Sequence, residues 1–119
     1  MTEQNRIVLV EDDSEQAALF AQVLSLVGYD VVTAATAEEA LVQLASGPTA
    51  LLLADWDLPG MHGDELIVTA KTQYPGIKTI LYSNHTHVEE ACASSGADGC
   101  MRKTEGIVRL RQLVKEVLA

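Results

Sequence analysis

The sequence lacks the features that define several large classes of protein. It has only two cysteines, Cys92 and Cys100, and their spacing fits neither a disulfide framework nor a zinc motif, so we expect free thiols in a reduced, cytoplasmic compartment. It shows no signal-peptide pattern and no apolar run longer than a strand, so we expect no membrane segment. Its eight basic residues are outnumbered by seventeen acidic ones, which argues against direct binding to nucleic acid.

What is present is enough for one folded domain. The chain has 119 residues, 48% of them hydrophobic, and contains no repeat, linker or low-complexity tract. Short apolar runs, typical of strands buried on both faces, alternate with helical patterns, and the predicted strands are residues 6–10, 30–34, 50–54, 78–82 and 99–101. This alternation predicts a parallel sheet with helices on both faces, in a single domain over residues 1–119.

The predicted helices between these strands have recognisable ends. Two of them open with capping boxes, Thr36-x-x-Glu39 and Thr86-x-x-Glu89. The first helix carries apolar residues at helical spacing and stops at Gly28, a residue that commonly ends helices.

The ends of the predicted strands carry the polar residues of interest, because ligands of open parallel sheets bind beyond the carboxyl ends of the strands. Four strands are followed there, in chain order, by Glu11 and Asp12, Asp55, Ser83 and Lys103. Crowded carboxylates raise each other's pKa unless a cation joins them, and oxygen ligands of this kind suit Mg²⁺. Aspartate is a nucleophile in phosphoryl transfer, which depends mainly on positioning and charge neutralisation. The set therefore predicts Mg²⁺-dependent phosphoryl chemistry at Asp55.

Three motifs carry a resemblance to a known family. They are Val-Leu-Val-Glu-Asp-Asp at residues 8–13, Leu-Ala-Asp-Trp-Asp-Leu-Pro-Gly-Met-His-Gly at residues 53–63, and Gly-Ala-Asp-Gly-Cys-Met-Arg-Lys at residues 96–103. Taken together and in this order, they resemble the receiver domain of two-component response regulators, of the chemotaxis-regulator type, over essentially the whole chain. The resemblance implies a flavodoxin-like, doubly wound α/β fold, with five helices and a five-stranded parallel sheet in the order 2-1-3-4-5.

The resemblance also implies a metal site around a phosphoacceptor. Asp55 would accept the phosphoryl group. Asp12 would bind Mg²⁺ directly, Glu11 would act on it through water, and Asp55 together with the backbone carbonyl of Asp57 would complete the protein ligands.

Two further residues would contact the phosphoryl group by the same resemblance, Ser83 through a hydrogen bond and Lys103 through an ion pair. The donor would be a histidine kinase or a phosphotransfer protein, and the output a downstream protein target or a fused output domain. We expect a switch that loses its own phosphoryl group slowly, not a turnover enzyme, acting as a monomer or weak homodimer. Whether the chain stands alone or is a fragment of a longer regulator is left open.

Three positions depart from the usual pattern of that family. Asn84 stands where a small residue usually follows the hydroxyl, and Cys100 replaces the usual Tyr or Phe, so the customary coupling between hydroxyl and ring cannot operate. Thr104 replaces the proline that usually follows the lysine. Because a non-prolyl cis bond costs about 2.5–4 kcal/mol, we predict a trans bond between Lys103 and Thr104.

Two other functions remain open from the residues. A pseudo-receiver would keep the fold without phosphoryl traffic, as the three replacements suggest. A haloacid-dehalogenase-type phosphatase would use Asp55-x-Asp57 as the start of its signature, but Pro59 stands where that signature needs a threonine, and the motif follows the third strand rather than the first.

The remaining candidates have simpler interpretations. Asp13 is predicted to cap a helix, Trp56 to lie in an exposed loop without a chemical role, and Cys92 to pack in the fourth helix. His85-x-His87 could chelate a transition metal but is more typical of the start of a helix.

Overall fold

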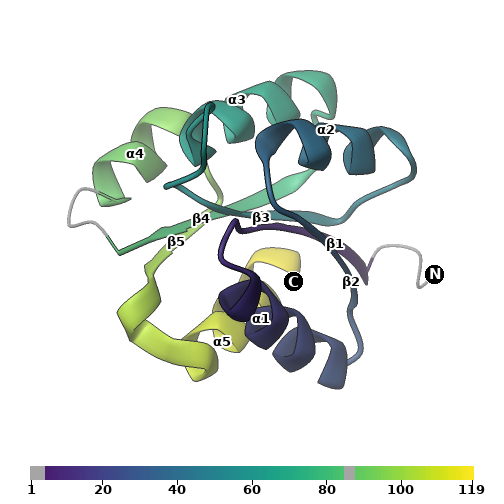
Figure 1. The fold of residues 1–119 in the computed structure, drawn as a ribbon, viewed down its shortest axis with the longest axis vertical. Coiled ribbons are helices and arrows are strands. Elements are labelled where there is room, and N and C mark those ends of the chain that lie inside the picture. Colours follow the sequence, from purple (N-terminus) through teal and green to yellow (C-terminus); the bar gives the residue numbers. More distant parts are fainter. Residues whose placement is uncertain (1–4, 85–87) are drawn as a thin grey trace.

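The computed structural model describes residues 5–84 and 88–119, which form one twisted parallel sheet between two layers of helices (Figure 1). In spatial order the strands are β2 (Asp30–Ala34), β1 (Arg6–Val10), β3 (Leu51–Asp55), β4 (Lys78–Ser83) and β5 (Gly99–Arg102). All neighbouring strands pair in parallel. The predicted fold class and the strand order 2-1-3-4-5 are confirmed.

Four of the predicted strand boundaries, in three strands, are wrong by one residue. The prediction began the third strand at residue 50 and ended the last three strands at residues 54, 82 and 101. In the structure Asp55 still pairs with Tyr82, and Ser83 still pairs with Arg102, so the ladder continues to these residues. Asp55 and Ser83 therefore belong to the sheet itself and do not lie in the loops that follow it.

The helices divide into two layers (Figure 1). On one face of the sheet lie α2 (Ala37–Ala45), α3 (Gly63–Gln73) and α4 (Val88–Ser95), and on the other lie α1 (Ser14–Leu26) and α5 (Gly106–Leu118). Thr36 caps α2 as predicted, since its Oγ1 accepts a hydrogen bond from the Glu39 backbone N–H at 3.1 Å. The predicted capping box is modified, because the Glu39 carboxylate accepts from the backbone N–H of Ala35, one residue before the cap, at 3.0 Å. The second predicted capping box begins at Thr86, outside the described residues. No described helix is both long and apolar enough to cross a bilayer.

Each face of the sheet has its own core, because successive strand residues point to opposite faces. The core under α2, α3 and α4 contains many alanines and valines. The core under α1 and α5 contains larger side chains, including the rings of Phe20 and Tyr82, which meet edge-to-face at 5.3 Å between centroids. Tyr82 is the largest fully buried side chain of the described residues.

The segment after β5 begins a new helix without a cis bond. No described peptide bond is cis, so the bond between Lys103 and Thr104 is trans, as predicted. A short 3₁₀ turn, Lys103–Glu105, follows the strand directly, and Gly106 then takes a φ of 84° where α5 begins. This turn fixes the position of Lys103 above the end of the sheet.

Candidate functional site

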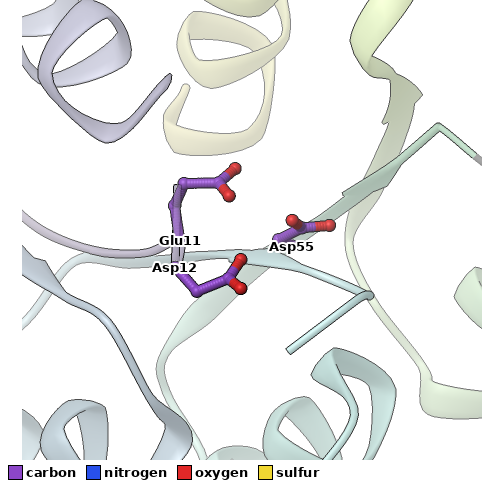
Figure 2. A group of neighbouring side chains, drawn as sticks. All are labelled: Glu11, Asp12 and Asp55. Atoms are coloured by element: carbon purple, nitrogen blue, oxygen red, sulfur yellow. The ribbon is translucent and has the colours of Figure 1, made fainter. Parts of the chain in front are cut away.

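Three carboxylates meet at the carboxyl ends of β1 and β3, two neighbouring strands of the sheet (Figure 2). One oxygen from each of Glu11, Asp12 and Asp55 lies within 4.8 Å of the others. Glu11 and Asp55 are each only 2% exposed, whereas Asp12 is exposed. Two of the three charges are thus removed from water, and the third faces it.

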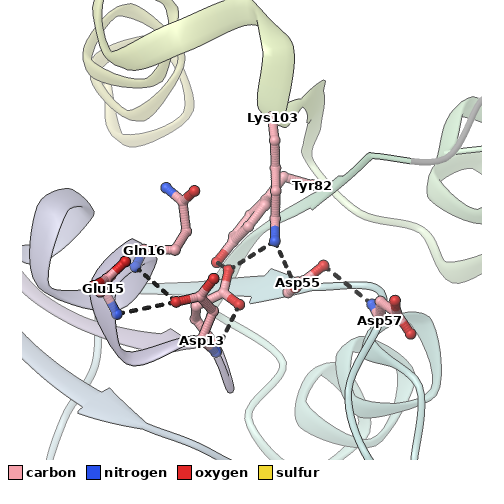
Figure 3. Close-up of polar contacts among 8 residues, drawn as sticks. Asp13, Glu15, Gln16, Asp55, Asp57, Tyr82 and Lys103 are labelled. Carbon is pink, nitrogen blue, oxygen red and sulfur yellow. Dashed lines mark hydrogen bonds and ion pairs between the residues drawn. The ribbon is translucent and has the colours of Figure 1, made fainter.

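Lys103 reaches back from the end of β5 to this cluster (Figure 3). Its Nζ lies 3.0 Å from Asp55 Oδ2 and 3.1 Å from Glu11 Oε1. Burial works against the charge of Lys103, but the hydrogen bonds and charges of Asp55 and Glu11 outweigh it and raise the pKa of the ammonium group. Lys103 therefore carries a firm positive charge between two buried carboxylates.

One ammonium group does not fully compensate this much negative charge. Burial, assisted by the charge of Glu11, raises the pKa of Asp55 from 3.8 to about 6, although the hydrogen bonds from Lys103 and from the Asp57 backbone act in the opposite direction. A carboxylate in this condition is stabilised by any further cation that its neighbours can help to bind. Oxygen ligands from Glu11, Asp12 and Asp55 fit a hard divalent ion such as Mg²⁺.

The loop after Asp55 holds the carboxylate from the other side. The backbone N–H of Asp57 donates to Asp55 Oδ1 at 3.1 Å (Figure 3). The Trp56 ring stacks on His62, with 4.3 Å between centroids and 4° between planes, and is half-buried. The prediction of an exposed Trp56 was therefore wrong, because the loop folds back and gives the indole a ring to stack on.

Gly63, the first residue of α3, lies against the backbone of Asp55. A Cβ at this position would collide with the Asp55 carbonyl oxygen. The Gly63 N–H also donates to the Trp56 carbonyl at 2.9 Å, which closes the loop. Only glycine lets the helix approach β3 this closely.

Tyr82 is a site residue that the sequence analysis missed. Its hydroxyl donates to Glu11 Oε1 at 2.9 Å, while the Asp13 backbone N–H donates to Glu11 Oε2 at 3.1 Å. Burial, together with the charges of Glu11 and Asp55, raises the pKa of Tyr82 well above its usual value, so the phenol stays protonated. The available signal was a tyrosine that follows two aliphatic residues in a buried strand, because a buried phenol normally requires a partner.

The structure brings together most of the predicted site. Glu11, Asp12, Asp55 and Lys103 form one cluster, as described above. Ser83 is fully buried at the end of β4, one residue beyond the partner of Asp55 in the ladder, and its contact with a phosphoryl group stays a prediction. The same holds for the backbone carbonyl of Asp57 as a metal ligand.

Other sequence candidates fall outside this cluster. Asp13 Oδ1 accepts hydrogen bonds from the Glu15 and Gln16 backbones, which confirms it as the cap of α1 (Figure 3). Cys92 is buried in α4, as predicted, and its thiol donates to the Gly99 carbonyl at 3.3 Å. Both thiols are free, and that of Cys100 is half-buried. His85 and His87 lie outside the described residues.

Comparisons with known proteins agree on one family. The family model described as "Response regulator receiver domain" matches residues 7–115. The response regulator protein FleR of Pseudomonas aeruginosa is 29% identical over 95% of this chain, which spans 24% of FleR. The crystal structure of a CheY-like receiver domain protein from Methanospirillum hungatei has a TM-score of 0.89 at 34% identity, covering 96% of this chain and 93% of that one. TrrA from Thermotoga maritima, solved in complex with Mg²⁺–BeF, has a TM-score of 0.88 at 30% identity, covering 96% and 99% of the two chains.

Proposed function

The chain belongs to the family of response regulator receiver domains, and from that membership we propose that it is a phosphorylation-dependent switch of a two-component system with Asp55 as its acceptor. One observation carries the proposal: the buried Asp55 carboxylate lies 3.0 Å from the Lys103 ammonium and beside the carboxylates of Glu11 and Asp12. Receiver domains are signalling modules and not turnover enzymes, so the phosphatase alternative is set aside.

The proposed reaction is a transfer of a phosphoryl group from phosphohistidine to Asp55. A carboxylate oxygen of Asp55 forms the new P–O bond while the P–N bond to the donor histidine breaks, and the histidine leaves with the electron pair. Lys103 neutralises charge on the transferred group, and the Ser83 hydroxyl donates to one of its oxygens. The Asp57 N–H keeps the carboxylate oriented meanwhile.

We assign Mg²⁺ to the acidic cluster as the cofactor of this reaction. Asp12 and Asp55 would hold it directly, Glu11 through water, and Asp57 through its backbone carbonyl. When bound, Mg²⁺ supplies the positive charge that lets an anionic phosphoryl group approach an anionic carboxylate. The close approach of carboxylate oxygens from Glu11, Asp12 and Asp55, within 4.8 Å of one another, supports the assignment. The complex of TrrA with Mg²⁺–BeF supports it further.

The partners follow from the proposed chemistry and from the relatives. The donor is a histidine kinase or a phosphotransfer protein, met in the cytoplasm, where free thiols such as Cys92 and Cys100 persist. We propose that residues 1–119 are one receiver domain acting as a monomer or weak homodimer. The chain spans about a quarter of FleR. We propose a downstream protein target or a fused output domain as the recipient of its signal. Slow loss of the phosphoryl group by autodephosphorylation resets the switch.

The test is labelling of the purified chain by a small acyl phosphate donor, followed by intact mass. We expect one phosphoryl group per chain in the presence of Mg²⁺ and none in a chelator or in Asp55→Asn. Asp13→Asn is the matched control, because asparagine caps a helix as well as aspartate does, and it should label like the wild type. Labelling that survives Asp55→Asn would refute the assignment of the acceptor.

A pseudo-receiver remains the second candidate function, favoured by the replacements at Asn84, Cys100 and Thr104. It predicts an unlabelled wild-type chain under every condition above. A Mg²⁺ titration followed by the fluorescence of Trp56, the single tryptophan, adds an independent readout next to Asp55. A pseudo-receiver with a lost metal site would show no response at millimolar Mg²⁺.

A further inference from the structure

Tyr82 is a buried polar side chain to which the proposed phosphoryl transfer gives no role. Its side chain starts on β4 and its hydroxyl reaches Glu11, the residue just after β1, so it spans the intervening strand β3 next to the side chain of Lys103 (Figure 3). The ring is fully buried and is held edge-to-face by Phe20, and Lys103 Nζ lies 5.5 Å from its centroid. The hydroxyl is therefore fixed in place before any ligand arrives.

Glu11 Oε1 is shared between two donors. Tyr82 donates to it at 2.9 Å, and Lys103 lies 3.1 Å from the same oxygen. The Glu11 side chain is inaccessible to bulk solvent, so a donor that leaves Oε1 is not simply replaced by a water molecule from solution. A buried charged acceptor left without a partner is strongly destabilised, and any movement of Lys103 away from Glu11 depends on what else holds this oxygen.

We propose, on the basis of the function proposed above, that Tyr82 is a positioning residue that allows Lys103 to transfer from Glu11 to the incoming phosphoryl group. Tyr82 keeps Glu11 Oε1 hydrogen-bonded throughout, so Lys103 can give up this contact at low cost. Without the hydroxyl, Lys103 is the remaining donor to Oε1 and is held back. No bond of Tyr82 itself forms or breaks in the transfer.

The first test is the rate of phosphoryl acceptance in Tyr82→Phe, which removes one oxygen and keeps the ring. At saturating Mg²⁺ we expect the rate to fall about tenfold, equivalent to about 1.4 kcal/mol in the barrier. The Mg²⁺ concentration giving half the Trp56 fluorescence change should stay within about twofold of the wild type, since the metal-facing atoms remain. Tyr74→Phe, a partly buried tyrosine of the other core, is the matched control and should change neither quantity.

Two outcomes of this test would overturn the proposal. A rate unchanged by Tyr82→Phe would show that Lys103 needs no substitute donor on Glu11. A parallel loss of rate, Mg²⁺ affinity and urea midpoint would show a general loosening of the core instead of a role in releasing Lys103.

The second test does not depend on phosphorylation. If Tyr82 and Lys103 share Glu11 Oε1, the fall in urea midpoint caused by Tyr82→Phe should be at least about twice as large in a Lys103→Met background as in the wild type, because that oxygen then has neither donor. Equal falls in both backgrounds would overturn the shared contact. A wild-type chain that is never labelled would overturn the proposed function, and with it the proposed movement of Lys103 to the phosphoryl group. The urea measurements would still show whether Tyr82 and Lys103 share Glu11 Oε1, so the two failures can be told apart.

Discussion

The strand ends on the two sides of β4 are built in opposite ways. On the β1–β3 side, Glu11 and Asp55 are buried and each of their carboxylate oxygens receives a hydrogen bond or ion pair from a donor of the protein. On the β5 side, Cys100 is half-buried, and an Arg102–Glu89 ion pair at 3.2 Å joins the strand to α4 with both side chains partly exposed to solvent. The polar contacts of the first region are buried, while this ion pair of the second region is open to solvent.

This difference suits the two regions to different parts of the proposed function, phosphoryl transfer in the first and conformational change in the second. Phosphoryl transfer depends on groups that are positioned in advance, and the β1–β3 side supplies them. A conformational change costs less where the polar contacts that break are exposed to solvent, and the Arg102–Glu89 pair is more exposed than the contacts of Glu11 and Asp55. The comparison predicts that substitutions on the first side alter the reaction strongly, and that substitutions on the second side leave it nearly unchanged.

The largest expected effect comes from Lys103→Met, which removes the cation of the β1–β3 side. We expect the rate of labelling by a small acyl phosphate to fall about 100-fold, the usual cost of losing one preorganised charged donor. Lys71→Met is the matched control, because Lys71 pairs with Asp98 at 3.2 Å in a partly exposed position away from the site. A fall in the labelling rate of less than about threefold would show that Lys103 has no substantial role in the reaction.

The next effect concerns stability and pH in the metal-free protein. Since the folded pKa of Asp55 is about 6 against a usual 3.8, folding favours its protonated form. The contribution of protonated Asp55 to the free energy of unfolding is fully present below about pH 4 and is lost as the pH rises through about 6. In a chelator at neutral pH, Asp55→Asn should therefore be more stable than the wild type by about 2 kcal/mol, measured by urea unfolding.

This difference between Asp55→Asn and the wild type should vanish near pH 4 and narrow on addition of Mg²⁺, which binds the wild-type carboxylates. A stability difference independent of both pH and Mg²⁺ would show that the ionised Asp55 carboxylate does not destabilise the folded chain.

A smaller effect is expected from Glu89→Gln on the exposed side. The substitution breaks the ion pair between Glu89 and Arg102. Because both side chains of this pair are partly exposed to solvent, the urea midpoint should fall only slightly. The fall should disappear at high salt, which screens the pair in the wild type as well. A large, salt-independent loss of stability would show that α4 is fixed to β5 more firmly than the exposure of this pair indicates.

The smallest effect is expected from Cys100→Phe, which restores the ring usual in the family. Cys100 faces the core under α4, on the opposite face of the sheet from Tyr82. We expect the rate of phosphoryl acceptance at Asp55 to stay within about twofold of the wild type, because distant sites act nearly independently. A tenfold change would show that the two sides of β4 are coupled even in the chemical step.

The sequence predicted the features that depend on local pattern. Alternating apolar runs gave the fold class, and the rule that ligands lie beyond strand ends brought Glu11, Asp12, Asp55 and Lys103 together. Tyr82 was missed because its contact with Glu11 depends on a side chain crossing a whole strand. The stacking of Trp56 on His62 was missed because a loop's return path is not encoded in its neighbouring residues.

Gly63 has a consequence for how this chain can vary through evolution or design. Its missing side chain is what lets α3 begin against the carbonyl of Asp55. At position 63 every other amino acid pushes the helix away from the acceptor. A grafted or redesigned version of this loop must therefore inherit the glycine before any of the residues that carry charge.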